Sequence, residues 1–69
     1  MNVITPKYPH VHVQLSGEDG NAFSILARVQ KAMMKAQIPK PEIELFMNTA
    51  TNGDYDHLLH TVMQYVDWS

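Results

Sequence analysis

Alternating apolar and polar residues mark one strand near the start of the chain. Residues 10–15 read HVHVQL, so two valines and a leucine share one face, while two histidines and a glutamine share the other. A period of two with β-branched residues predicts a half-buried strand. Residues 1–9 contain Pro6 and Pro9, which cannot donate to a strand ladder, so we expect an extended lead-in there.

A first helix is predicted after a turn over residues 16–20, which read SGEDG. It begins near Asn21, because Asp19 or Asn21 can accept hydrogen bonds from the free amides of the first turn. It stops near Gln37, because the residue before Pro39 avoids helical angles. Its apolar residues form a wide stripe typical of a helix that faces a core: Phe23, Ile25, Leu26, Val29, Ala32, Met33 and Ala36.

Two further helices follow with the same spacing. The second opens at Pro41, and Asn52–Gly53 supplies a left-handed stop at its end. The third follows at once, with Asp54 as its capping residue and Asp56 adding negative charge to the first turn. Spacing of i, i+3, i+4 and i+7 predicts the buried sides: Ile43, Phe46, Met47 and Ala50 in the second helix, and Leu59, Val62, Met63 and Val66 in the third.

The predicted order is therefore one N-terminal strand followed by three helices, a small single α+β domain over residues 10–69. A lone strand leaves its backbone donors and acceptors unpaired on both edges. The strand therefore either folds back in a short hairpin onto Val3 and Ile4 or pairs with the same strand of a second copy. The second arrangement adds buried area to a small core, so we expect a homodimer with strand 10–15 as the first candidate for its seam.

Composition narrows the class of protein. The chain has 69 residues, no cysteine and a hydrophobic content of 45%, so we expect one folded domain without disulfides or thiolate metal sites. Five basic residues stand against seven acidic ones, a net charge of −2, which argues against general binding to nucleic acid or membranes. No apolar run approaches the ~20 residues of a membrane span, and residues 1–9 lack the apolar stretch of a signal peptide.

Four histidines suggest a metal site at first sight. His10 and His12 share one face of the predicted strand, and His57 and His60 are neighbours on the third helix. Either pair could ligate zinc with a nearby aspartate as a third donor. Their spacing matches no recognised metal motif, however, and two solvent-facing polar pairs explain the pattern more simply. We therefore expect neither a bound metal nor a cofactor.

The segment Gly53–His57, GDYDH, is the densest polar cluster. One interpretation is a recognition patch, in which an aromatic anchor is flanked by acids and binds a protein surface. The other is an ordinary helix start, in which the first aspartate caps, the second faces the helix dipole, and the tyrosine packs against Leu59. On the first interpretation the partner-binding residues are Tyr55, Asp56 and His57, with Trp68 as a further candidate.

Two other features are weaker as sites. Residues 16–21 lead into a helix as phosphate loops do, but their two acids would repel a phosphate and no nucleotide-binding motif is present. Arg28, Lys31 and Lys35 form a basic strip that could follow a phosphate backbone, although three charges on a net acidic chain usually form a solvated face. No serine stands in a nucleophile-elbow context and cysteine is absent, so we expect no enzyme.

Two stretches resemble the signature of an uncharacterised family of short bacteriophage and bacterial proteins. They are Val13–Leu26, VQLSGEDGNAFSIL, and Gly53–Leu59, GDYDHLL. The resemblance covers residues 10–68, and leaves the lead-in outside the pattern. Relatives often carry a tryptophan in place of Tyr65 and a cysteine in place of Val62. Both differences keep an apolar or bulky side chain, so the fold implied by the resemblance is unaffected, whereas a thiol can have no role at that position.

The resemblance implies a context rather than a chemistry. Short phage proteins without catalytic motifs often bind a host protein, which would place this chain in the host cytoplasm. We therefore expect a non-enzymatic, homodimeric interaction protein that modulates an unidentified protein partner. The alternatives are a homodimer that sequesters a small ligand or a metal at its interface and, third, a nucleic-acid-binding protein.

Overall fold

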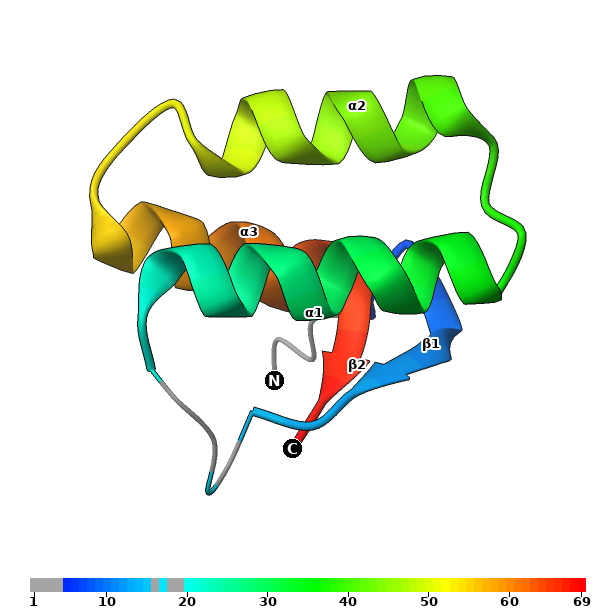
Figure 1. Cartoon of the computed structure of the whole chain (residues 1–69), viewed down its shortest axis with the longest axis horizontal. Coiled ribbons are helices and arrows are strands. Elements are labelled where there is room, and N and C mark those ends of the chain that lie inside the picture. Colours follow the sequence, from blue (N-terminus) through cyan, green and yellow to red (C-terminus); the bar gives the residue numbers. More distant parts are fainter. Residues whose placement is uncertain (1–4, 16, 18–19) are drawn as a thin grey trace.

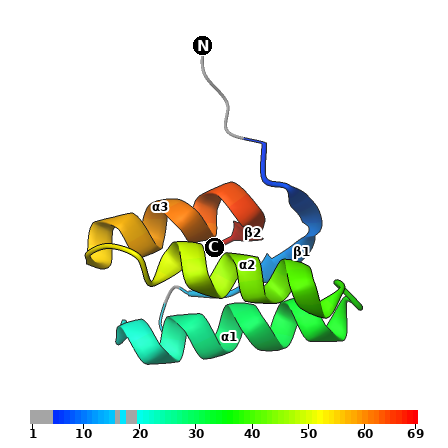
Figure 2. The same ribbon diagram turned by 90° about the horizontal axis from the view of Figure 1, so that it is seen from above.

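The computed structural model of the chain describes residues 5–15, 17 and 20–69. The elements over these residues are β1 (Tyr8–Val13), α1 (Ala22–Lys35), α2 (Lys40–Ala50), α3 (Tyr55–Tyr65) and β2 (Val66–Trp68). Figure 1 shows the helices along the long axis, with α2 antiparallel to α1 and α3 and with both strands below them. Figure 2, seen from above, shows α2 between α1 and α3, and Figure 1 shows it above both, so the three helices do not share one layer. The α+β class is confirmed, with a C-terminal strand that the sequence pattern did not indicate.

This second strand changes the topology of the sheet. Over the described residues β1 and β2 form a two-stranded parallel sheet, in which His12 lies opposite Asp67 and Val13 opposite Trp68. Beyond the strands, the amide of Leu15 donates to the carbonyl of Ser69 at 2.7 Å. Parallel strands require a crossover connection, and here all three helices supply it. The prediction of a lone strand is wrong, because β2 occupies one edge of β1.

The bounds of β1 also differ from the prediction. It begins at Tyr8, inside the expected lead-in 1–9, and ends at Val13 rather than at residue 15. Its start is fixed by the amide of Lys7, which donates to the carbonyl of Gln64 at 2.9 Å. The register shifts between Tyr8 and His12, and this irregularity accommodates Pro9, which has no amide hydrogen to donate. The alternative hairpin partner, Val3 and Ile4, lies outside the described residues.

The start of α1 agrees with the prediction. Oδ1 of Asn21 accepts a hydrogen bond from the amide of Phe23 at 2.8 Å, as expected of a capping residue. The other candidate cap, Asp19, lies outside the described residues. The helix ends at Lys35, two residues before the predicted stop.

A left-handed residue follows α1, whereas none follows α2. Gln37 has a φ of 61°, its amide donates to Met34, and the amide of Ile38 donates to Met33. This is the Schellman arrangement, in which glycine is the usual residue. The predicted left-handed stop at Asn52–Gly53 is wrong, since neither residue has a positive φ. Instead α2 closes on Thr51, whose amide and hydroxyl both donate to the carbonyl of Met47.

The core lies between the helices and the inner face of the sheet. Its buried apolar residues come from every element: Val11, Val13, Ile25, Leu26, Val29, Met33, Ile43, Phe46, Ala50, Leu58, Val62 and Val66. Thr61 is also buried, and its hydroxyl donates to the carbonyl of His57 at 2.8 Å. Phe23, predicted for the core, is 81% exposed, because it lies off the side of α1 that Ile25, Leu26, Val29 and Met33 bury. No helix in the described part of the chain is long and apolar enough to span a membrane.

Candidate functional site

Tyr55 opens α3 and ties it to the residues before α1. Asp54 caps the helix, since its Oδ1 accepts a hydrogen bond from the amide of His57 at 2.9 Å. The hydroxyl of Tyr55 donates to the carbonyl of Gly20 at 2.6 Å, across 35 residues of sequence. The ring remains 45% exposed. Tyr55 therefore has a fixed orientation and a largely accessible surface, which is the combination that a recognition residue needs.

His57 faces the end of α2. Its Nε2 lies 2.7 Å from the carbonyl oxygen of Thr49, so Nε2 carries the hydrogen and donates. A Cβ atom placed on Gly53 would lie 2.7 Å from Cγ of this ring. The glycine is therefore required by the histidine that packs over it, and the ring holds the corner between α2 and α3. The geometry gives His57 a structural contact within the chain.

Asp56 lies on the exposed side of the first turn of α3. Its side chain makes no hydrogen bond or ion pair with any described residue. Its carbonyl accepts a hydrogen bond from Nδ1 of His60 at 2.9 Å. The carboxylate therefore contributes negative charge to the surface beside Tyr55.

Trp68 approaches Tyr55 through the pairing of β2 with β1. Its ring is 44% exposed, and its backbone position is set by the register with Val13. Tyr55 and Trp68 stand on two sides of a cavity of about 270 Å³, which we name the Tyr55–Trp68 pocket. The pocket is lined by Leu15, Gly20, Ile25, Tyr55, Leu59, Val62, Met63 and Trp68.

The four candidate residues thus have different positions. Tyr55 and Trp68 line one pocket, Asp56 stands on the neighbouring surface, and His57 packs against the end of α2. The sequence pattern did not indicate that Leu15 and Ile25 would form a wall of the same pocket. Both are apolar residues, which the predicted strand and helix place in the core.

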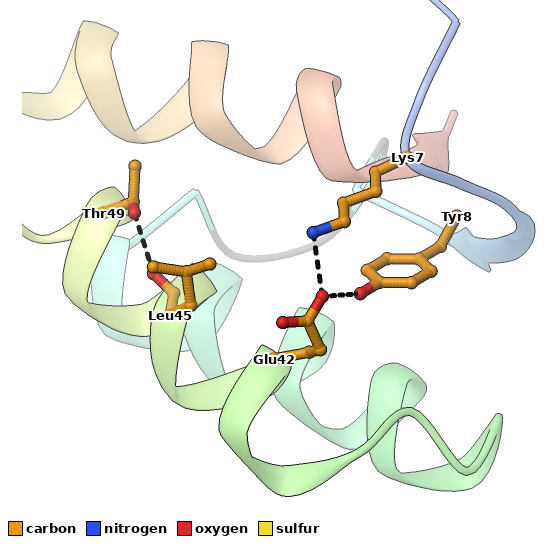
Figure 3. A network of polar contacts seen from close by, with 5 residues as sticks. All are labelled: Lys7, Tyr8, Glu42, Leu45 and Thr49. Carbon is orange, nitrogen blue, oxygen red and sulfur yellow. Dashed lines mark hydrogen bonds and ion pairs between the residues drawn. The ribbon is translucent and has the colours of Figure 1, made fainter.

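A second polar network joins the start of β1 to α2, and the sequence did not indicate it. Figure 3 shows Oε1 of Glu42 between Lys7 and Tyr8, each of which donates a hydrogen bond to it at 2.8 Å. Nζ of Lys7 also lies 5.6 Å from the ring centre of Tyr8 and 5.7 Å from that of Tyr65. These contacts fix the segment that precedes β1 against α2.

The three groups of this network affect one another's ionisation. The hydrogen bond from Lys7, and then that from Tyr8, lower the pKa of Glu42 below its ordinary value. The hydrogen bond to Glu42 raises the pKa of Lys7. Burial, followed by the hydrogen bond to Glu42, raises the pKa of Tyr8. At neutral pH the carboxylate and the ammonium are therefore both charged, which is the pattern of a structural ion pair.

His12 links the two strands through a hydrogen-bonded chain. Its Nδ1 lies 2.7 Å from Oδ2 of Asp67, and its Nε2 lies 3.0 Å from Oγ of Ser69. The order of groups is that of a hydrolase triad, but the side chains of His12 and Asp67 are 52% and 56% exposed. Such triads act in sites from which water is excluded. The exposure favours a structural role, in which the chain fastens β2 to β1.

The histidine pairs considered as metal ligands lie in different surroundings, His12 on the sheet and His57 and His60 on α3. Among the residues that the structure describes, no three histidine, aspartate or glutamate side chains gather in a way that could hold a metal ion. His57 and His60 each donate to a backbone carbonyl. A metal shared between two copies of the chain, the alternative considered from the sequence, is not tested by a single copy.

Comparisons of the chain with protein-family models, with curated proteins and with solved structures find no match.

Proposed function

We propose that the protein is a non-enzymatic interaction domain, which binds a segment of a partner protein in the Tyr55–Trp68 pocket. The observation that supports this most directly is that two aromatic residues, 13 positions apart, line one apolar pocket and stay nearly half exposed. Tyrosine and tryptophan are the residues most often responsible for the affinity of protein interfaces. Each combines a large apolar surface with a polar group that can reach a partner.

The size of the pocket favours a side chain over a cofactor. Sites for drug-sized ligands usually have volumes of about 300–1,000 Å³. The Tyr55–Trp68 pocket, at about 270 Å³, falls below this range. One large apolar side chain fits such a volume, whereas a nucleotide or a typical cofactor would extend out of it.

The charge near the pocket specifies the partner further. None of the described residues that line the pocket is charged. Tyr55 lies between Asp54 and Asp56, so the surface beside its ring is acidic. Basic residues that flank the apolar anchor of a partner would complement this charge. The proposed partner is therefore a segment with one large apolar side chain between lysines or arginines.

The biological context of the proposal comes from the family resemblance. It comprises a phage-encoded protein, a host protein as the partner, and the host cytoplasm as the location. The bacteriophage origin can be tested separately, by finding the gene within a prophage or a phage genome.

The proposal includes a homodimer that forms at an outer edge of the two-stranded sheet. The chain's own β2 supplies a pairing edge for β1, so a second copy is not required for that edge. In a two-stranded sheet each strand still has an outer edge at which a second copy could add. Light scattering at several concentrations would test this: a constant monomer mass would contradict it.

Selection of binding peptides tests the proposed pocket. We expect peptides selected from a displayed random library on the wild-type protein to share one aromatic or leucine-like residue flanked by basic residues. Trp68→Ala should weaken a selected peptide about thirtyfold, since truncation of such an anchor costs on the order of 2 kcal/mol. Phe23→Ala is the matched control, because Phe23 is more exposed and does not line the pocket.

Two outcomes would contradict the proposal, and two controls accompany them. A consensus without an apolar residue, or equal losses for Trp68→Ala and Phe23→Ala, would contradict the proposal. Thermal melting of each variant must accompany the binding measurement, because a lower affinity counts only where the variant is folded. Tyr55→Phe provides a second variant, which keeps the ring in the pocket and removes only the hydrogen bond to Gly20.

A further inference from the structure

A second hollow, separate from the Tyr55–Trp68 pocket, lies between β1 and α1. It has a volume of about 310 Å³ and shares no lining residue with the first pocket. Arg28, Lys31 and Lys35 of α1 border it on one side, and His12 and Gln14 border it on the other. The basic strip found in the sequence therefore forms one wall of a concave site rather than a convex solvated face.

The positive charges are concentrated within this hollow. Spacing of three and four residues places Lys31 beside both Arg28 and Lys35 on one side of α1, about 5–6 Å apart along the helix. Among the described residues, no carboxylate forms an ion pair with Lys31 or Lys35. Two lysines four positions apart repel each other on a helix, and an anion bound between them would remove this repulsion.

The wall formed by β1 and the residue after it is polar. The ring of His12 is held in place by Asp67 on Nδ1 and by Ser69 on Nε2. The carboxylate of Asp67 opposes anion binding, but it is engaged by the histidine. Gln14 adds an amide side chain to this wall. The hollow therefore combines a cationic wall with a polar one around one small volume.

We propose that this hollow binds the oligophosphate group of a small phosphorylated molecule. A phosphate group accepts charge-assisted hydrogen bonds from lysine and arginine, which are the strongest that these side chains form. Three of the five basic residues of the chain border this one hollow. The site would be independent of partner binding at the Tyr55–Trp68 pocket.

The overall charge of the chain favours a compact anion over a long one. Among the described residues outside the hollow, two lysines stand against five carboxylates. Electrostatic effects extend over about 8–10 Å at physiological salt. A compact oligophosphate experiences mainly the three cations, whereas a nucleic acid strand would also extend over acidic surface.

Titration with inorganic tripolyphosphate at low salt, followed by NMR of the backbone amides, tests the proposal. We expect saturable shifts for His12, Lys31 and Lys35 and little change around Trp68. Lys31→Gln should weaken binding about tenfold, as expected for the loss of one charge-assisted contact. Lys40→Gln removes the same charge from an exposed position outside the hollow and should leave the affinity within about twofold, since it makes no such contact.

The remaining arms identify the source of the phosphate. A nucleoside triphosphate that binds as tightly as tripolyphosphate, or more tightly, would support a small phosphorylated ligand. A single-stranded oligonucleotide that binds more tightly than either, with a steeper dependence on salt, would overturn the compact-ligand proposal in favour of nucleic acid. Absence of any shift in the hollow at millimolar tripolyphosphate, or equal effects of Lys31→Gln and Lys40→Gln, would also overturn it.

Discussion

Replacement of Gly53 by alanine should destabilise the fold, and should do so only while His57 is present. The added Cβ would lie 2.7 Å from Cγ of His57 and 2.9 Å from its Cβ and Cδ2. Gly53 has no positive φ, so its backbone conformation is open to alanine. The ring cannot easily move aside, because Nε2 donates to the carbonyl of Thr49. The cost of the substitution is therefore steric.

The expected size of this effect follows from two opposing contributions. Overpacking of this kind usually costs about 1–3 kcal/mol. Removal of a glycine from the unfolded chain returns about 0.4–1 kcal/mol. The net loss for Gly53→Ala is about 1–2 kcal/mol, which corresponds to a decrease in Tm of about 4–16 °C in a domain of this size.

A double-mutant cycle separates the steric cause from a backbone cause. In the His57→Ala background the clash is absent, so Gly53→Ala should be neutral or stabilise the fold by up to about 1 kcal/mol. The interaction free energy between the two positions should then be about 1–3 kcal/mol, measured by urea unfolding followed by circular dichroism. If Gly53→Ala costs the same in both backgrounds, the histidine is not the reason for the glycine. A left-handed residue at position 53 would give that additive result.

Three other predictions concern the end of α1, the Glu42 network and the core. Gln37→Gly should raise the free energy of unfolding by about 0.5–1 kcal/mol, because glycine adopts the positive φ at position 37 without strain; a lower Tm would contradict the Schellman geometry. The stability that Glu42 contributes is present above its unfolded-state pKa of 4.5 and is lost as the pH falls through its lower folded-state pKa. The free energy of unfolding of Glu42→Gln, measured in urea, should therefore change less with pH across this window than that of the wild type. Parallel pH dependences of the two proteins would contradict the network. Phe23→Ser should change the free energy of unfolding by less than about 0.5 kcal/mol, whereas Phe46→Ala should cost about 3–5 kcal/mol. Comparable losses in thermal melts of these two variants would refute the assignment of the core.

The helices could be predicted because their buried sides repeat at the helical period. Asn21 and Asp54 were identified as caps from residue type and position, and both accept the expected backbone hydrogen bonds. These features depend on residues within one or two turns of each other, where sequence pattern and geometry are closely linked. The end of α1 was less predictable, because a glutamine in place of glycine gives no signal for a left-handed residue.

The strand β2 could not be predicted from periodicity. Val66 continues the i, i+3, i+4, i+7 spacing of α3, so a pattern with the helical period extends past the end of the helix. Three residues are also too few to show alternation. The strand is fixed by pairing with β1, which is far away in the sequence. His12 and Asp67, which lie opposite each other, are 55 positions apart.

The composition of the candidate site depends on that same non-local pairing. Tyr55 and Trp68 were proposed separately, and their meeting in one pocket follows from the position of β2 beside β1. Likewise, the role of Gly53 and His57 at the corner between α2 and α3 depends on a side-chain contact that the sequence does not encode as a pattern.

We propose the Tyr55–Trp68 pocket as the surface that binds a partner. Trp68 is the single tryptophan of the chain, so its fluorescence reports directly on that pocket. Titration with a selected peptide should give a saturable change in Trp68 emission, with the same Kd as the anisotropy of a labelled copy of the peptide. A peptide whose apolar anchor is replaced by alanine should give no change. Binding that is detected by anisotropy while Trp68 emission stays constant would contradict the claim.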